Sequence, residues 1–275
     1  MSQISKSGGA SGANVVGPGT STSGDIAIFN NASGTLLADS GVSLTGTQPG
    51  QVLTYNGTIA SLQNPNAYLS MYDDFLTENT ISNYGWLIIT GGTSSITPIA
   101  SLDNGHPGVV QLSFSSVFAN CRYFLNGLIL GGGRVTLNWV TKFAQLSNGV
   151  DRFAALIGFE NDNGEPITNG IYFRYSDNVN GGQWQCISVS ASTPTVVNTA
   201  TAADTNWHRY TIDVNAAASS ITFSIDGTSV GTINTNIPTT AINPAILFFD
   251  QISSGATITM YVDLFYLYQS LTTPR

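Results

Sequence analysis

The sequence predicts an all-β fold, an antiparallel sandwich or jelly roll, and three observations support this prediction. Apolar and polar residues alternate in many short runs, most clearly over residues 221–233, where Ile221, Phe223 and Ile225 alternate with polar side chains. Turn-forming pairs such as Asp-Gly, Asn-Gly and Gly-Gly separate these runs. No window of a dozen residues combines a helical period with helix caps. We therefore expect about ten to fourteen short strands and no long helix.

The first segment, residues 1–66, differs in composition from the rest of the chain. The phrase GDIAIFNNASG begins at Gly24, and GQVLTYNGT repeats its pattern from Gly50, with Phe29 matched by Tyr55. Such a polar, glycine-rich segment cannot bury enough apolar area alone to offset the entropy of ordering it. We therefore predict an extended shaft with two weak repeats, in which several chains share one thin core. A flexible linker that happens to repeat is the alternative.

The second segment, residues 67–275, reads as a series of strands that follow a joint around Pro65. Asp226-Gly227 supplies the two positive-φ residues of a tight hairpin within the best-patterned run. The predicted strands lie, in chain order, in residues 109–115, 134–143, 152–160, 170–176, 184–190, 207–214, 221–233, 245–252 and 256–268. This number of short strands suits one large β domain.

The charge balance argues against two classes of partner. The formal net charge is −8, and the only lysines are Lys6 and Lys142. Nucleic acid requires a basic stripe that neutralises phosphates, so we expect no nucleic-acid partner, and an anionic membrane surface is disfavoured for the same reason. The longest apolar run, residues 245–249, is far too short to span a bilayer, so we expect no membrane insertion.

The cysteines and histidines offer no cofactor site. Cys121 and Cys186 are expected to be two small buried thiols, with a single disulfide bridge as the alternative. No Cys/His cluster has the ligand spacing of a zinc site. We therefore predict no cofactor.

Two strand patterns resemble a known family. WHRYTIDV, at residues 207–214, followed by ITFSIDGTSVGTI resembles the back sheet of concanavalin A-like (lectin/glucanase, laminin G-like) jelly rolls. DDFL, at residues 73–76, and YVDLFYLY, at residues 261–268, resemble the first and last strands that pair in that family. The resemblance covers roughly residues 70–270, and it implies a concanavalin A-like jelly-roll domain over 67–275.

The first segment resembles a different family. VVGPGTSTSGDIAIFNNASGTLLADSGV, at residues 15–42, is similar to the N-terminal phrase of many bacteriophage tail-fibre and virion-fibre proteins, in which GQVLTYNGT is also frequent. The resemblance implies a homotrimeric virion fibre that attaches to other virion proteins through residues 1–66. The N-terminus lacks the apolar stretch of a signal peptide, so we expect synthesis in the host cytoplasm and release by lysis.

FENDNGEP is the strongest catalytic candidate. Glu160, Asp162 and Glu165 satisfy the Glu-x-Asp-x-x-Glu pattern of jelly-roll glucanases, where one carboxylate acts as nucleophile and another as general acid. The turn residues Asn163-Gly164 and Pro166 place Glu165 in a hairpin tip, and the glucanase pattern has apolar residues between its carboxylates. A solvated loop is therefore the preferred alternative. The same loop is dense in oxygen ligands and could bind Ca²⁺, although it lacks EF-hand spacing.

A second candidate site is a loop with the composition of a sugar-binding surface. Sugar binding calls for an aromatic face with amide or carboxylate groups beside it. The candidate residues in YSDNVNGGQW are Tyr175, Asp177, Asn178, Asn180 and Trp184. The alternative is that the aromatic residues pack in the sandwich and the asparagines only form turns.

Taken together, these patterns favour a structural fibre protein of a phage virion. The C-terminal jelly roll would bind host-surface polysaccharide, and several copies on one stalk would multiply a weak affinity. A polysaccharide depolymerase or glycosidase of the same fold is one alternative. A non-adhesive virion decoration or baseplate component is the other.

Overall fold

The structure, a computed structural model, divides the chain into two units, Met1–Pro65 and Asn66–Arg275. The second unit is described over residues 68–75, 85–116, 118–162, 164–252 and 254–273. In the first unit only the backbone of four strands is described: β1 (Asp25–Phe29), β2 (Leu37–Ser43), β3 (Val52–Tyr55) and β4 (Ala60–Gln63). β1 pairs with β2 and β3 pairs with β4, both antiparallel. The rest of the predicted shaft and repeats lies outside the described residues, so the shaft stays a prediction.

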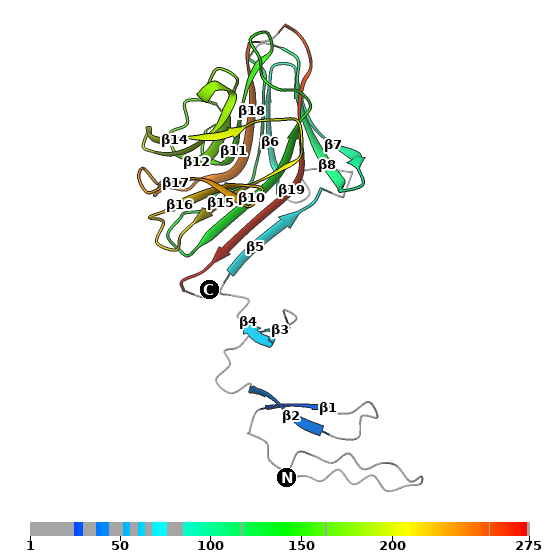
Figure 1. The fold of residues 1–275 in the computed structure, drawn as a ribbon, viewed down its shortest axis with the longest axis vertical. Coiled ribbons are helices and arrows are strands. Elements are labelled where there is room, and N and C mark those ends of the chain that lie inside the picture. The colour runs from blue at the N-terminus through cyan, green and yellow to red at the C-terminus, as the bar shows by residue number, and fades with distance from the viewer. Residues whose placement is uncertain are drawn as a thin grey trace. The chain divides into compact units, whose positions relative to one another are not determined.

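The second unit is a sandwich of two antiparallel sheets (Figure 1). One sheet has eight strands: β5 (Tyr68–Asp73), β7 (Ser94–Asp103), β8 (His106–Phe114), β10 (Val135–Phe143), β15 (His208–Val214), β16 (Ile221–Ile225), β17 (Thr228–Ile233) and β19 (Ile258–Ser270). Their order is β17-β16-β15-β10-β19-β8-β7, and β5 also pairs with β19. β8 pairs with the first half of the long strand β19 and β5 with the second half.

The other sheet has seven strands in the order β14-β13-β12-β11-β18-β9-β6. Their bounds are β6 (Leu87–Gly91), β9 (Asn120–Phe124), β11 (Arg152–Glu160), β12 (Gly170–Tyr175), β13 (Gln183–Ser190), β14 (Thr193–Ala202) and β18 (Asn243–Ile252). A short 3₁₀ turn, η3 (Asn180–Gly182), precedes β13. None of the helical turns in the described residues is long and apolar enough to cross a membrane.

The main core lies between the two sheets and is rich in aromatic side chains. Alternate residues of each strand point inward, as the period of two requires, and Trp139, Trp184 and Phe223 are among the largest fully buried ones. Burying each such side chain contributes roughly 1.5–3 kcal/mol relative to leaving it exposed. This continuous core explains why one domain of this length folds around two large sheets.

Most of the predicted strands are confirmed, as is the tight hairpin between β16 and β17. Asp226 and Gly227 both have positive φ, at 51° and 79°. The first strand of the domain pairs with the last one, as predicted. The first strand lies earlier in the chain than predicted, because β5 ends at Asp73, where DDFL begins. β6, β7, β9 and β14 were not predicted as strands.

A second apolar layer covers the outer face of the seven-stranded sheet. Leu156, Leu247 and Ile187 are buried there, on the side opposite the main core. The loop that joins β11 to β12 contributes Ile167, which is also buried in this layer. This loop, with the strands beside it, forms the surface on which the candidate site lies.

Candidate functional site

The first carboxylate of the predicted catalytic pattern, Glu160, is the last residue of β11 and is only 1% exposed. Arg122 on β9 donates from Nε to Glu160 Oε1 at 2.5 Å, and the backbone N–H of Asp162 donates to Glu160 Oε2 at 3.0 Å. The Arg122 guanidinium also lies 3.9 Å from the ring centre of Phe124. Burial raises the pKa of Glu160, and the pairing with Arg122 opposes that shift. The expectation of a solvated loop is therefore wrong for Glu160, which is buried and ion-paired.

The second carboxylate, Asp162, closes the β11–β12 loop. Asp162 Oδ2 accepts hydrogen bonds from the backbone N–H of Thr168 at 2.6 Å and from its hydroxyl at 2.8 Å. Asn161 Oδ1 accepts the N–H of Asn169 at 2.9 Å beside it. These contacts are those of a side chain that fixes the loop backbone.

The third carboxylate, Glu165, lies in the β11–β12 loop, as predicted, and pairs with Arg174 on β12. Arg174 Nε lies 2.7 Å from Glu165 Oε1, and Arg174 Nη2 donates to Glu165 Oε2 at 2.8 Å. Each of the three carboxylates is therefore engaged with a partner that organises this loop. The structure does not bring a pair of them together over one cleft.

The two aromatic candidates for sugar stacking, Tyr175 and Trp184, are buried in the main core. Their rings contact each other and Phe143. This corrects their placement at the surface, because β12 and β13 turn both side chains inward. The alternative, that these two aromatic residues pack inside the sandwich, is therefore confirmed.

The polar candidates of the same loop differ in what they contact. Asp177 pairs with Arg152 at 2.8 Å and accepts the hydroxyl of Ser147 at 2.7 Å. Asn180 Nδ2 donates to the backbone oxygens of Trp184 and Thr199, so Asn180 holds a turn. Of the five residues predicted to bind glycan, Asn178 lines the larger of two hollows in this part of the described surface.

Two hollows adjoin this loop, and Glu165 lines both of them. The larger, of about 490 Å³, lies where β9 and β11 begin and β18 ends, and we call it the Asp250 hollow. Its walls include Phe118, Asn120, Arg152, Asn178, Glu165, Phe249, Asp250 and Gln251. The smaller, of about 390 Å³, is lined mainly by apolar residues, which come from β12, β13 and β14 and from the loops beside them.

Asp250 is the unusual residue of the larger hollow. It is 4% exposed, and its Oδ2 accepts the backbone N–H of Phe118 at 3.1 Å. Its Oδ1 is buried and has no hydrogen-bond partner among the described residues. Leaving a buried acceptor unsatisfied costs roughly 1–3 kcal/mol, so a donor that reached this oxygen would be bound favourably. Burial raises the pKa of Asp250, the Phe118 N–H opposes the shift, and the nearby Asp151 adds to it.

Phe118 stands at the edge of the same hollow in a strained conformation. Its φ is 62°, and its side chain is 82% exposed. A left-handed backbone costs a residue with a Cβ roughly 1–2 kcal/mol, and a large apolar side chain gains nothing from this exposure. The hydrogen bond from its backbone N–H to Asp250 Oδ2 helps to hold this conformation, and both residues line the same hollow.

Neither Phe118 nor Asp250 is among the site residues that the sequence pattern predicts. They are 132 residues apart in the chain and meet only because β9 pairs with β18. A signal for Asp250 was available: a lone carboxylate follows the apolar run AILFF in a predicted buried strand.

The described part of the chain contains neither a disulfide bridge nor a group of side chains placed to hold a metal ion. Cys121 and Cys186 are both free and buried, so the prediction of two buried thiols is confirmed. Burial raises their pKa values to about 11 and about 12, which keeps both thiols protonated at neutral pH. No group of three or more His, Cys, Asp or Glu side chains among the described residues is placed to hold a metal ion, so no Ca²⁺ ligand set is identified.

Solved structures share this fold at low sequence identity. The carbohydrate recognition domain of Emp47p has a TM-score of 0.52 and 10% identity, over 75% of this chain and 96% of that one. The carbohydrate esterase vb_24B_21 of the Shiga toxin-encoding bacteriophage phi24B has a TM-score of 0.48 and 16% identity, over 74% and 97%. The β-glucanase of Bacillus licheniformis has a TM-score of 0.49 and 16% identity, over 72% and 97%.

At these identities the likeness to the Emp47p domain concerns the fold alone, a sandwich of two antiparallel sheets. A comparison with curated proteins found no matching sequence. Residues 105–264, more than half of the chain, match the family described as "SO2946-like, C-terminal domain". The chain therefore belongs to the SO2946-like C-terminal domain family.

Proposed function

We propose that the chain is a structural fibre protein of a phage virion, whose jelly roll binds a host-surface glycan in the Asp250 hollow. The observation that carries the proposal is the buried, unsatisfied Oδ1 of Asp250, a residue that lines the hollow. A sugar hydroxyl is a donor of the right size and chemistry for this oxygen. Emp47p supports the proposal at the level of the fold, since its domain is named for carbohydrate recognition.

The walls of the hollow supply the other groups that sugar binding needs. The exposed ring of Phe118 offers an apolar face on which a pyranose ring can stack. The amides of Asn120, Asn178 and Gln251 can donate to and accept from sugar hydroxyls. An aromatic face beside convergent amides is the combination that fixes both the position and the orientation of a sugar.

The charges around the hollow favour one class of sugar. Arg152 is paired with Asp177, and Glu165 with Arg174. Among the described carboxylates that line the hollow, Asp250 is the one with an acceptor atom that has no hydrogen-bond partner. The hollow therefore suits a sugar that presents hydroxyl or N–H groups and disfavours one that presents a carboxylate.

The first segment completes the proposed function. Residues 1–66 resemble the N-terminal phrase of phage fibre proteins, and we assign them attachment to other virion proteins and homotrimer formation. Three copies on one stalk would raise the avidity for a polysaccharide well above the affinity of one hollow. The protein would thus reside in the virion and act in host adhesion.

The test uses the full chain and the substitution Asp250→Asn, which keeps the shape of the side chain and its contact with Phe118. Retention on host cells and on their extracted polysaccharide is measured together with the release of new reducing ends. We expect at least tenfold weaker retention for Asp250→Asn, since a hydrogen bond to a charged group is worth roughly 1.5–3 kcal/mol. We expect no new reducing ends.

Asp213→Asn is the matched control, because Asp213 lies on the other sheet and pairs with Arg134. Unchanged retention in both variants would overturn the assignment of the hollow. New reducing ends that disappear in Glu165→Gln would replace adhesion with the glycosidase alternative. The absence of any binding on a confirmed host would favour a decoration or baseplate component.

A further inference from the structure

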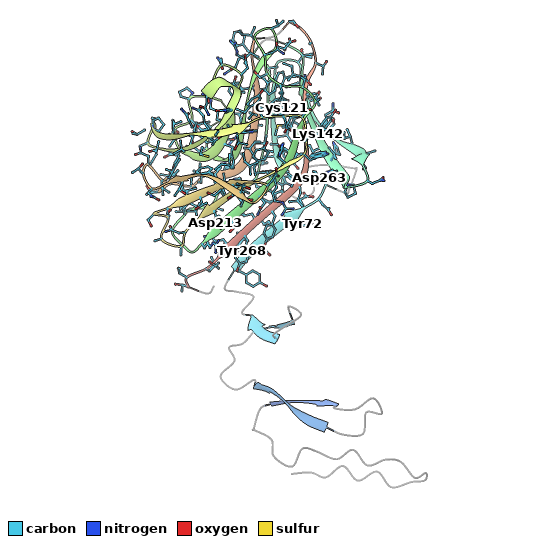
Figure 2. The ribbon with its side chains drawn as sticks, viewed as in Figure 1. Tyr72, Cys121, Lys142, Asp213, Asp263 and Tyr268 are labelled. Carbon is cyan, nitrogen blue, oxygen red and sulfur yellow. The ribbon has the colours of Figure 1, made fainter. Side chains whose placement is uncertain are left out.

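A group of tyrosines lies on the outer face of the eight-stranded sheet, whereas Asp250 lies on the seven-stranded sheet. Tyr68 and Tyr72 come from β5, and Tyr266 and Tyr268 come from the second half of β19; we call these four the tyrosine face. Tyr72 is directly opposite Tyr266, and the rings of Tyr68 and Tyr268 stack with centres 5.9 Å apart. Figure 2 shows Tyr72 and Tyr268 on these neighbouring strands, with Asp213 at the same end of the sheet.

Tyr72 is the most exposed of the large side chains on this face, at 62%. Its neighbours on the inner side of β5 are held by the domain: Met71 packs on the main core, and Asp73 accepts the indole N–H of Trp86 at 2.7 Å. The domain therefore fixes β5 firmly while leaving the ring of Tyr72 in solvent. An exposed aromatic ring on a rigid strand is typical of a residue that anchors an interface.

The strand that carries Tyr72 has one edge that pairs with no strand among the described residues, and we call it the open edge. Among the described strands, β5 pairs only with β19. An unpaired edge presents backbone N–H and C=O groups that can accept another strand. The edge and the tyrosine face adjoin each other, so one partner can cover both.

The polar groups beside the tyrosine face are already paired with one another. Asn138 Oδ1 accepts the hydroxyl of Thr211 at 2.7 Å. Asp213 accepts hydrogen bonds from Arg134 at two atoms and from the hydroxyl of Thr136. The charges of this surface are therefore balanced, which limits repulsion between two copies of a chain of net charge −8.

We propose that the tyrosine face and the open edge of β5 pack against a second copy of this chain. The proposal rests on the homotrimer of the proposed function, and it names the surface of the jelly roll that takes part. β5 begins three residues after Pro65, where the first unit ends, so whatever joins the first units also holds copies of β5 close together. Such tethering raises the effective concentration of one β5 near another to roughly the millimolar range.

The test introduces one cysteine at a time into the full chain and treats the protein with a short bifunctional maleimide. The native thiols of Cys121 and Cys186 are buried and protonated, so a new surface cysteine is the reactive one. We expect Tyr72→Cys to give crosslinked chains. Tyr261→Cys is the matched control, because Tyr261 lies in the first half of β19, away from β5, and we expect it to stay uncrosslinked.

A second variant covers the case in which crosslinking is blocked by geometry. Tyr72→Arg places like charges together wherever copies meet at this face, and it leaves the buried side of β5 unchanged. We expect the concentration at which the oligomer dissociates to rise at least tenfold in sedimentation, while Tyr261→Arg leaves it unchanged.

The outcomes separate this proposal from the proposed function. A stable oligomer that neither crosslinks in Tyr72→Cys nor weakens in Tyr72→Arg would overturn the interface and leave the homotrimer standing. A wild-type chain that is a monomer would overturn both the interface and the homotrimer. Glycan binding in the Asp250 hollow is measured independently, by the retention of Asp250→Asn on polysaccharide. Loss of polysaccharide retention in Tyr72→Arg, with the oligomer unchanged, would make the tyrosine face a glycan surface and overturn the proposal.

Discussion

Glu160 and Asp250 are both buried carboxylates on the seven-stranded sheet, yet they are satisfied to very different degrees. Both oxygens of Glu160 have partners, Arg122 on one side and the N–H of Asp162 on the other. Asp250 has a partner for one oxygen only, the N–H of Phe118. The sequence pattern directs attention to Glu160, but the structure gives Glu160 a role in holding a loop. The contrast indicates that a buried group without a hydrogen-bond partner is a better guide to a binding site than a cluster of carboxylates in the sequence.

The largest expected effect comes from removing the cation that pairs with Glu160. Arg122→Leu leaves Glu160 buried without its cation, so we expect the free energy of unfolding to fall by about 3–5 kcal/mol in urea denaturation. Burial raises the pKa of Glu160 in the folded state, so the folded chain favours the protonated form. The loss should therefore be smaller at acidic pH and grow as the pH rises through the folded-state pKa.

Arg134→Leu is the control for this prediction, because it removes a cation from the exposed pair with Asp213. It should change stability by less than about 1 kcal/mol. Equal losses in the two variants, or a loss in Arg122→Leu that does not depend on pH, would contradict the assignment of Glu160 as a buried structural carboxylate.

A second prediction concerns Phe118, the residue whose backbone N–H contacts Asp250. Phe118→Gly removes an exposed ring from a backbone with a φ of 62°, a conformation that glycine adopts freely. We expect the chain to gain about 1 kcal/mol in thermal or urea unfolding. Retention on polysaccharide should fall threefold to tenfold, since the stacking face is lost.

Phe118→Tyr, which keeps the ring and the strain, serves as the matched control. It should retain binding and leave stability unchanged. A Phe118→Gly variant that binds as well as the wild type would remove Phe118 from the proposed site.

The smallest expected effect concerns a carboxylate pair around a histidine on the eight-stranded sheet. His208 contacts Asp226 through Nδ1 at 2.6 Å and Asp204 through Nε2 at 2.9 Å. Burial lowers the pKa of His208, but the two aspartates outweigh it, so its pKa is raised above 6.5. The stabilisation is therefore fully present below the unfolded pKa of His208 and is lost as the pH rises through the folded-state pKa.

Asp226→Asn removes one of these charges and keeps the tight turn, since Asn-Gly is equally suited to it. We expect stability to fall by about 0.5 kcal/mol at pH 5.5, a modest loss because both aspartates are half-exposed, and by less at pH 8.5. The comparison is made with Asp213→Asn, whose partner Arg134 does not titrate in this range. A loss that grew towards alkaline pH would contradict the role of His208.

Much of the fold follows from local pattern. Strands such as β10 and β16 alternate apolar and polar residues, and Asp226-Gly227 marks its hairpin, so both could be predicted from a few neighbouring residues. β14 is rich in threonine and mostly half-exposed or exposed, and β7 contains Pro98, so neither has the apolar alternation that identifies a strand. These strands are defined by their partners, β13 and β8, more than by their own sequence.

The candidate site could not be predicted in the same way. Its two principal residues, Phe118 and Asp250, come together through strand pairing between distant segments. Tyr175 and Trp184 have the composition of a sugar site, but composition does not tell which face of a strand a residue occupies. A one-residue change of register would have turned both rings outward, and only the completed sheet decides between the two arrangements.

The most direct test of the account is a crystal structure of the full chain with an oligosaccharide from a polysaccharide that it retains. The account predicts a sugar ring against Phe118 with a hydroxyl within about 3 Å of Asp250 Oδ1. A sugar bound elsewhere on the jelly roll, with the Asp250 hollow occupied only by water, would contradict it.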